Sequence, residues 1–297
     1  MPIDKGPSKQ PVKQKNKYKQ GVFGLVCTTF NLWLRKLPQY AIIVGITGTV
    51  LLVLQSILLL SIFGIVGFDL LELIGTAPLD VVLNLLIYDI QVGILVLVVI
   101  LSVTGLAVYA VVAGAAIHFA LTDYESPNSG DIRESFSFAL DRIGTLVGVQ
   151  LLVSIVVVGL AFVASVVMVM FDFFVGIALF ILVIYIGVRL APAQAVAIAE
   201  DRGAMESLTI SWYLTGGHFW HVFFGQIVMS IAFFFIEIAV GVMVGVVAVI
   251  IFFSPTSILI ATLISSLLLS SSNYIYFAVL FRDLEARGPF GNHERNQ

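Results

Sequence analysis

Six apolar runs long enough to cross a lipid bilayer recur along this chain. The hydrocarbon core of a bilayer needs about 20 consecutive apolar residues in a helix. The sequence offers such runs at residues 40–67, 91–121, 143–170, 173–199, 219–253 and 257–281. The composition agrees, because 60% of the residues are hydrophobic and only 11% are charged, whereas soluble domains are roughly 25% charged. We therefore predict an all-α integral membrane protein with six transmembrane helices.

The connections between these runs predict three helical hairpins. The third and fourth runs meet in "MVMFDFFVG", which leaves room only for a tight turn around Phe171 to Phe173. Pro255 in "FFSPTS" marks the corresponding turn between the fifth and sixth runs. Proline favours a turn there because it lacks a backbone N–H and keeps the preceding residue out of the helical region.

The basic residues predict the orientation of the chain in the membrane. All 15 Lys and Arg residues fall in or beside connections on the same side of the six predicted spans, the side that also holds both termini. The opposite connections carry only acidic charges, at Asp69, Glu72, Asp80, Asp89 and Asp172. Cytoplasmic loops are enriched in Lys and Arg. The sequence thus predicts a multi-pass protein of the cell membrane with both termini in the cytoplasm.

Composition also divides the chain into three parts. Residues 1–20 are rich in Lys, Gln and Pro and contain few apolar side chains, so we expect a flexible basic cytoplasmic tail. Residues 21–287 form the predicted six-span membrane domain, and residues 288–297 a second cytoplasmic tail. The single cysteine, Cys27, excludes a disulfide within the chain and a zinc or iron–sulfur cage, because these need several convergent ligands. We expect no cofactor and no metal site.

Each predicted hairpin follows an amphipathic segment on the cytoplasmic side. Before the first span, apolar residues at helix-like spacing are Phe23, Val26, Phe30, Trp33 and Leu34. Similar segments start at Glu134, ahead of the third span, and at Glu206, ahead of the fifth. The pattern predicts three repeats of one unit, an interfacial helix in the headgroup region followed by two spans. These helices either anchor and space the hairpins, which we favour, or bind a ligand.

The segment from Met205 to Leu214 shows the expected two faces most clearly. Met205, Leu208 and Trp212 follow i, i+3, i+7 spacing and form an apolar face. The polar positions Glu206, Thr209 and Tyr213 lie elsewhere on the helical wheel. We expect the glycines of "TGG" at residues 215–217 to end this helix.

Glu237 is the only charged residue in the fifth apolar run. It lies 16 residues after His221, which is about 24 Å along a helix at 1.5 Å per residue, near the middle of the membrane. We predict a polar site in which Glu237 contacts the hydroxyl-rich sixth span through Ser266, Ser270 and Asn273. In one interpretation a neutral carboxyl links two helices. In the other, Glu237 serves an ion or substrate, as acids at this depth often do.

Three further residues near the cytoplasmic side carry candidate chemistry. His218 and His221 have the i, i+3 spacing that two metal ligands on one helical face require, but an interfacial role is favoured because no cysteine lies nearby. Arg189 is embedded more deeply than any other basic residue. We expect it to reach toward the cytoplasm or to pair with Glu200 or Glu206.

A resemblance to a known family rests on the run from Val188 to Phe223. Its pattern of a basic residue, an acid, a glycine, an "SW.L" core and a "G.FW" entry to the next span resembles prokaryotic multi-pass proteins related to the membrane domain of glycerophosphoryl diester phosphodiesterases. The residues that carry it are Arg189, Glu200, Gly203, Ser211, Trp212, Leu214, Gly217, Phe219 and Trp220. The ending "YFAVLFRDLEARG" at residues 276–288 is also similar. The resemblance implies a stand-alone six-span protein without the separate catalytic domain, and therefore no phosphodiesterase activity.

The sequence contains no constellation typical of an enzyme. It lacks a phosphate-binding loop with its lysine, an HExxH motif, a plausible Ser-His-Asp set and a nucleic-acid module. We expect a non-enzymatic scaffold, accessory subunit or lipid-associated factor, whose partners are membrane lipids and either a protein or a second copy, with no nucleic acid. The alternative is a transporter or channel that uses Glu237 and the polar face of the sixth span. A membrane-embedded lipid enzyme is the third hypothesis.

Overall fold

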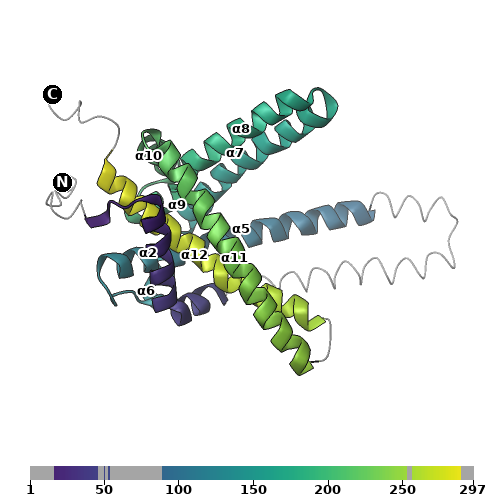
Figure 1. Ribbon diagram of the computed structural model, residues 1–297. Helices are drawn as coiled ribbons and strands as arrows, with labels where there is room; N and C mark the ends of the chain where they lie inside the picture. Colours follow the sequence, from purple (N-terminus) through teal and green to yellow (C-terminus); the bar gives the residue numbers. More distant parts are fainter. Residues whose placement is uncertain (1–16, 46–49, 51–52, 54–88, 253–255, 289–297) are drawn as a thin grey trace, which may run out of the picture.

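The computed structural model describes residues 17–45, 50, 53, 89–252 and 256–288. All the regular secondary structure in these residues is helical, as predicted. Figure 1 labels the helices. They are α2 (Val22–Arg35), α5 (Asp89–Glu125), α6 (Ile132–Asp141), α7 (Ile143–Met170), α8 (Phe173–Leu190), α9 (Ala193–Ala199), α10 (Ala204–Gly216), α11 (Phe219–Phe252) and α12 (Thr256–Arg287).

Long apolar segments in the described part of the chain confirm a multi-pass membrane protein. Four of them are long and apolar enough to cross a bilayer, namely Val99–Glu125, Ile143–Met170, Phe173–Ala199 and Phe219–Val247. Most of the predicted first span, residues 40–67, lies outside the described residues. The predicted sixth span lies within the α12 helix, but most of its side chains before residue 269 are also outside the description. The total of six spans therefore stays a prediction.

The helices converge at one end of the molecule and diverge at the other (Figure 1). The short helices α2, α9 and α10 contact α12, and α6 packs against α5 and α7 on the same side of the molecule (Figure 1). We call this region the convergent end. The α7–α8 pair, α5 and α11 extend away from it in different directions. In an 18-residue apolar stretch of each of α7 and α11, only 6% of the residues are buried. These spans therefore present long apolar flanks, which suit contact with lipid.

The α7 and α8 helices lie side by side and are joined by Phe171 and Asp172 alone. The Asp172 carboxylate begins α8 by accepting a hydrogen bond of 2.9 Å from the Val175 amide, which satisfies one unpaired N–H group of the first turn. Gly176 lets the two backbones approach closely, because a Cβ atom there would lie 2.5 Å from the Met168 Cα atom.

The predicted fourth span, residues 173–199, is two helices rather than one. The α8 helix ends at Leu190, and α9 starts at Ala193, directly after Pro192. Pro192 has no backbone N–H group, so it cannot donate the next helical hydrogen bond and α8 stops before it. The short α9 helix lies in the core of the convergent end, where Ala193 and Val196 are at most 1% exposed.

The amphipathic segment at the N-terminus packs into the convergent end. The α2 helix contacts α11 and α12, and Val26 and Trp33 are buried as its predicted apolar face requires. The Trp33 indole N–H donates a hydrogen bond of 2.8 Å to the Ser271 hydroxyl of α12. Phe23 and Leu34, which were predicted on the same face, are 74% and 64% exposed. The surface that α2 buries is thus narrower than its sequence pattern indicates.

The α10 helix buries a different face from the one its sequence predicts. Its apolar residues Met205 and Trp212 are 68% and 40% exposed, whereas Ser207, Ser211 and Thr215 are buried. The small hydroxyl side chains allow close packing against α8 and α9, and they bond to nearby carbonyl oxygens. The exposed aromatic and apolar side chains of α10 face away from the protein core.

Candidate functional site

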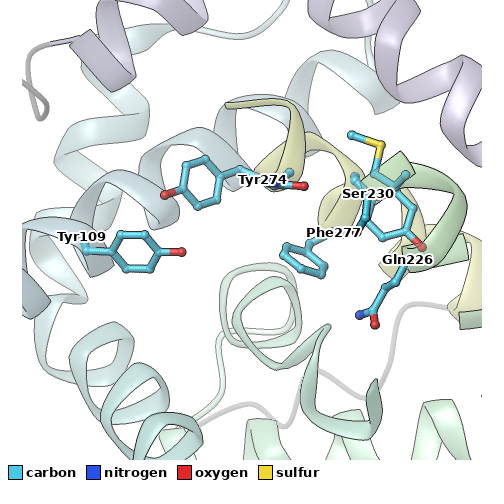
Figure 2. Close-up of a pocket in the computed structure, with 8 residues that line it drawn as sticks. Tyr109, Gln226, Ser230, Tyr274 and Phe277 are labelled. Carbon is cyan, nitrogen blue, oxygen red and sulfur yellow. The ribbon is translucent and has the colours of Figure 1, made fainter. Parts of the chain in front are cut away.

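A cavity of about 340 Å³ lies between α5, α11 and α12. Figure 2 shows the side chains around it, with Tyr109 and Tyr274 on one side and Gln226 and Ser230 on the other. The complete lining consists of Tyr109, Gln226, Met229, Ser230, Asn273, Tyr274, Tyr276 and Phe277. Cavities of this volume suit small molecules or the polar part of a larger ligand.

The cavity lies within the apolar spans rather than at their ends. Gln226 follows Phe219, the first residue of its span, by seven positions, which corresponds to about 10 Å along the helix. On α5, Tyr109 precedes Asp123 of the convergent end by 14 positions, or about 21 Å. The polar groups of the cavity thus lie along the apolar segments that are long enough to cross a bilayer, rather than at the ends of those segments.

Several polar groups of the cavity have no hydrogen-bond partner among the residues that the structure describes. Within the described residues, no hydrogen bond involves the side chains of Gln226, Ser230 or Asn273. The Tyr276 hydroxyl is buried and also lacks a partner in the described part of the chain. An unsatisfied polar group is costly in hydrocarbon surroundings, so these groups favour a ligand that supplies hydrogen bonds.

The cavity contains one of the four residues predicted for the intramembrane polar site. Asn273 lines it, and Glu237 does not. The side chains of Ser266 and Ser270 lie outside the described residues. Glu237 follows Gln226 by 11 positions, so the two residues lie about 20° apart around α11 and about 16 Å apart along it. Glu237 therefore shares a helix face with the cavity but lies deeper along the span.

At the convergent end, three residues of the predicted interface motif form a compact group. The Arg189 guanidinium carbon lies 4.5 Å from the Trp212 ring centroid, and its Nη1 atom donates to the Trp212 carbonyl oxygen at 2.9 Å. The Arg189 carbonyl oxygen accepts hydrogen bonds from Ser211 at 2.8 Å and from Thr215 at 3.2 Å. These contacts fix the end of α8 against α10.

The other predicted motif residues lie outside this group. The Glu200 carboxylate lies 4.0 Å from the Arg202 guanidinium, Gly217 ends α10, and Trp220 is 65% exposed. Of the two expectations for Arg189, pairing with an acid is not found among the described residues, where Glu206 instead pairs with Arg202 at 2.9 Å. The α10 helix presents its aromatic side, rather than its acidic first turn, to Arg189.

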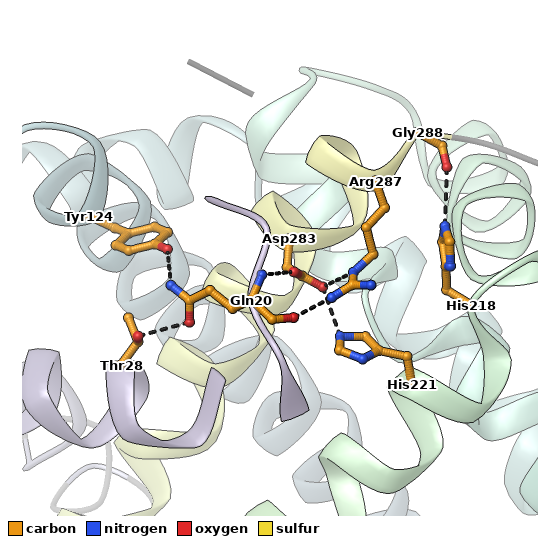
Figure 3. A network of polar contacts seen from close by, with 8 residues as sticks. All are labelled: Gln20, Thr28, Tyr124, His218, His221, Asp283, Arg287 and Gly288. Atoms are coloured by element: carbon orange, nitrogen blue, oxygen red, sulfur yellow. Dashed lines mark hydrogen bonds and ion pairs between the residues drawn. The ribbon is translucent and has the colours of Figure 1, made fainter. Parts of the chain in front are cut away.

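A second polar group joins the N-terminal segment to the ends of α11 and α12 (Figure 3). The buried Asp283 carboxylate accepts a hydrogen bond of 2.6 Å from the backbone N–H group of Gln20 and one of 2.7 Å from the Arg287 side chain. It also lies 2.9 Å from the His221 Nε2 atom. Burial alone would raise the pKa of Asp283, but these donors hold that pKa below its usual value. The Gln20 side chain extends the network by donating to the Tyr124 hydroxyl at 3.0 Å.

Two other groups of ion pairs hold the convergent end together. Asp123, near the end of α5, is 1% exposed and pairs with Arg35 and, at 3.8 Å, with Lys36. Arg282 of α12 pairs with Glu125 and, at 2.6 Å, with Glu285. The Asp123 pairs connect α5 to the end of α2, and the Arg282–Glu125 pair connects α12 to α5. The Arg282–Glu285 pair lies within α12.

The two histidines are structural in this arrangement. His221 belongs to the Asp283 group, and the His218 Nε2 atom lies 3.4 Å from the Gly288 carbonyl oxygen. Burial lowers the pKa of His218. No cluster of three or more His, Cys, Asp or Glu side chains able to hold a metal ion occurs in the described residues.

The sequence analysis did not identify most of the cavity. Tyr109, Gln226 and Tyr274 come from three helices, and nothing in the sequence indicates which faces of those helices meet. One signal was available, because Gln226, Ser230 and Glu237 recur on a single face of the most apolar run. The buried acids Asp123 and Asp283 gave no comparable signal, since each lies among ordinary end-of-helix charges.

Comparison with family models, with curated proteins and with solved structures found no match to this chain.

Proposed function

We propose that the protein is a non-enzymatic, lipid-associated integral membrane protein that holds an amphiphilic molecule in the cavity between α5, α11 and α12. The observation that carries this proposal is that Gln226, Ser230 and Asn273 have no side-chain hydrogen bond within the described part of the chain, although the helices around them are apolar. An amphiphile supplies hydrogen bonds to such groups and also has an apolar part that suits the exposed flanks of the spans.

The proposal includes the predicted architecture and orientation. Six spans in three hairpins place the convergent end on the cytoplasmic side of the cell membrane, with both termini there. The supporting pattern is the distribution of Lys and Arg, all 15 of which fall on the side predicted to be cytoplasmic. We also propose that the chain is related to the membrane domain of glycerophosphoryl diester phosphodiesterases, as its sequence motif indicates. This resemblance too implies a membrane-embedded protein.

Lipid retention tests the proposed function. The full-length protein is purified in mild detergent, and native mass spectrometry measures how much amphiphile remains bound. We expect retention near one equivalent, and we expect the double variant Gln226→Leu, Asn273→Leu to lose it. Ser165→Leu on α7 is the matched control, because it replaces a polar residue of another span far along the chain from the cavity. Equal retention by the double variant and the control would refute a role for the cavity.

A transporter or channel is the second candidate, and one observation favours it. Gln226, Ser230 and Glu237 share one face of α11, so polar groups recur along the length of the span. Transport predicts that liposomes containing the protein pass protons or a solute, and that Glu237→Gln abolishes the flux without unfolding the protein. Unchanged flux in this variant would remove Glu237 from any pathway and leave it an interhelical contact.

A further inference from the structure

We propose that Arg189, Tyr185 and the neighbouring tryptophans form a binding site for a phosphate group, supplied by the headgroup of a phospholipid. This inference deepens the proposed function and rests on it, because it names the chemical class of the amphiphile. The site lies at the end of α8, where α10 and the start of α11 meet it.

The first observation concerns the charge of Arg189. Five other described arginines lie within 4.0 Å of a carboxylate, namely Arg35, Arg142, Arg202, Arg282 and Arg287. Arg189 is partly buried, and no described carboxylate lies within that distance of it. A partly buried cation without an anion is costly to maintain. An external anion would complete the site.

The second observation concerns hydrogen-bond donors. The Tyr185 hydroxyl oxygen accepts from the Arg189 Nε atom at 3.2 Å and the Nη2 atom at 2.9 Å. Its own O–H group therefore points away from Arg189 and is available to donate. The guanidinium carries five N–H groups, of which three have partners in the described structure. Two N–H groups and one O–H group thus remain for a ligand, and all are donors.

The third observation concerns the aromatic surroundings. Trp212 and Trp220 are 40% and 65% exposed beside Arg189 and Phe219. Indole rings prefer the membrane–water interface, which is also where lipid phosphates lie. Below this level, α8 and α11 present exposed apolar residues such as Ile184 and Phe224. This combination of an anion site above an apolar flank fits a phospholipid better than a free phosphate.

The site and the cavity share one side of α11. Tyr185 contacts the Phe219 ring, with 5.0 Å between centroids. Gln226 lies two helical turns beyond Phe219. A phospholipid whose phosphate binds Arg189 therefore has its glycerol and chain region at the level of the cavity, about 10 Å deeper.

The test compares a lipid that has a phosphate-containing headgroup with one that lacks it. The full-length protein is placed in nanodiscs that contain phosphatidylglycerol and diacylglycerol with identical chains, and native mass spectrometry gives the ratio of the two lipids bound. We expect the wild type to prefer phosphatidylglycerol, and Arg189→Gln to reduce that preference roughly tenfold, as for a hydrogen-bonded charge. Arg133→Gln is the matched control, because Arg133 is an exposed arginine of α6 without an ion pair in the described structure.

Two further variants separate the proposal from simple misfolding. Arg189→Lys keeps the charge but loses the planar fork, so we expect an intermediate preference. Tyr185→Phe keeps the ring and removes the O–H donor, so we expect a smaller loss of preference in a folded protein. An unchanged lipid ratio in folded Arg189→Gln and Tyr185→Phe would overturn the phosphate site.

The outcomes also distinguish this inference from the proposed function. A wild type that retains both lipids equally, through Gln226 and Asn273, would leave the lipid-associated function standing and refute the phosphate site. A wild type that retains neither lipid would refute the function itself. Soluble glycerol phosphate is the third arm, and displacement of phosphatidylglycerol by an equal concentration of it would refute the lipid as the source of the phosphate.

Discussion

The Nε2 atom of His221 on α11 lies 2.9 Å from a carboxylate oxygen of Asp283 on α12. The same oxygen accepts a hydrogen bond of 2.7 Å from Arg287, one helical turn further along α12. The other oxygen of Asp283 binds the Gln20 amide at 2.6 Å. One buried carboxylate thus joins the N-terminal segment to the ends of two long helices, and it supports the convergent end on which the proposed lipid site depends.

Removal of the Asp283 charge should destabilise the protein strongly. Asp283→Asn leaves Arg287 with a weaker partner in a buried position, and breaking such a pair costs about 3 kcal/mol or more. Unfolding in detergent, followed by circular dichroism, measures the change. Asp141→Asn at the exposed end of α6 is the control and should change the stability little. Equal stability of the two variants would contradict the role given to Asp283.

The stability of the protein should depend on pH through Asp283. Its pKa in the folded state is lower than the ordinary value of 3.8, so its contribution is complete above that value and disappears as the pH falls through the folded pKa. We expect the thermal midpoint in detergent to fall more steeply below pH 4 for the wild type than for Asp283→Asn. Parallel curves for the two proteins would show that other groups dominate acid unfolding.

A methyl group at Gly176 should disturb the contact between α7 and α8. A Cβ atom there would lie 2.2 Å from the Met168 Cβ atom and 2.5 Å from its Cα atom, so the backbones must separate. We expect Gly176→Ala to lower stability by about 1–3 kcal/mol. In the same helix, a Cβ atom at Gly187 meets nothing within 4 Å. Gly187→Ala should therefore be neutral or stabilising by up to about 1 kcal/mol, as thermal unfolding can measure.

The proposed orientation can be tested with the single native cysteine. Cys27 is exposed on α2, and the proposal places it in the cytoplasm. A membrane-impermeant maleimide should therefore label it only after the cells are opened. The variant Phe171→Cys, made in a Cys27→Ser background, should react in intact cells, because Phe171 lies at the opposite turn and is 80% exposed. The reverse labelling pattern would refute cytoplasmic termini.

Much of the secondary structure followed from local patterns in the sequence. The predicted third span matches α7 at both ends, and the predicted turn around Phe171 separates α7 from α8. Both features rest on local physical rules, namely the length of an apolar helix in a bilayer and the acidic cap at Asp172. The break after Leu190 also has a local cause, Pro192. The sequence analysis missed it because residues 173–199 form one apolar run of the length expected for a single span.

The candidate sites depended more on contacts between distant segments. The sequence identified Asn273, Arg189, Ser211 and Trp212 as candidates. One of its two expectations for Arg189 was a pairing with Glu200 or Glu206, and these acids instead contact Arg202. Arg189 donates to a main-chain oxygen and a tyrosine hydroxyl, and unpaired main-chain carbonyl oxygens occur at the end of every helix. Which of them Arg189 contacts depends on how α8 and α10 pack.

The sequence by itself determined that the chain is a helical membrane protein and where several of its helices begin and end, because hydropathy and helix caps act over a few neighbouring residues. Only the tertiary structure decided which faces are buried. It buries Ser207 and Ser211 while it exposes Met205 and Trp212, since close helix packing favours small side chains and lipid accepts large ones. It also brought Tyr109, Gln226 and Asn273 around one cavity, because their positions depend on the angles at which three helices meet.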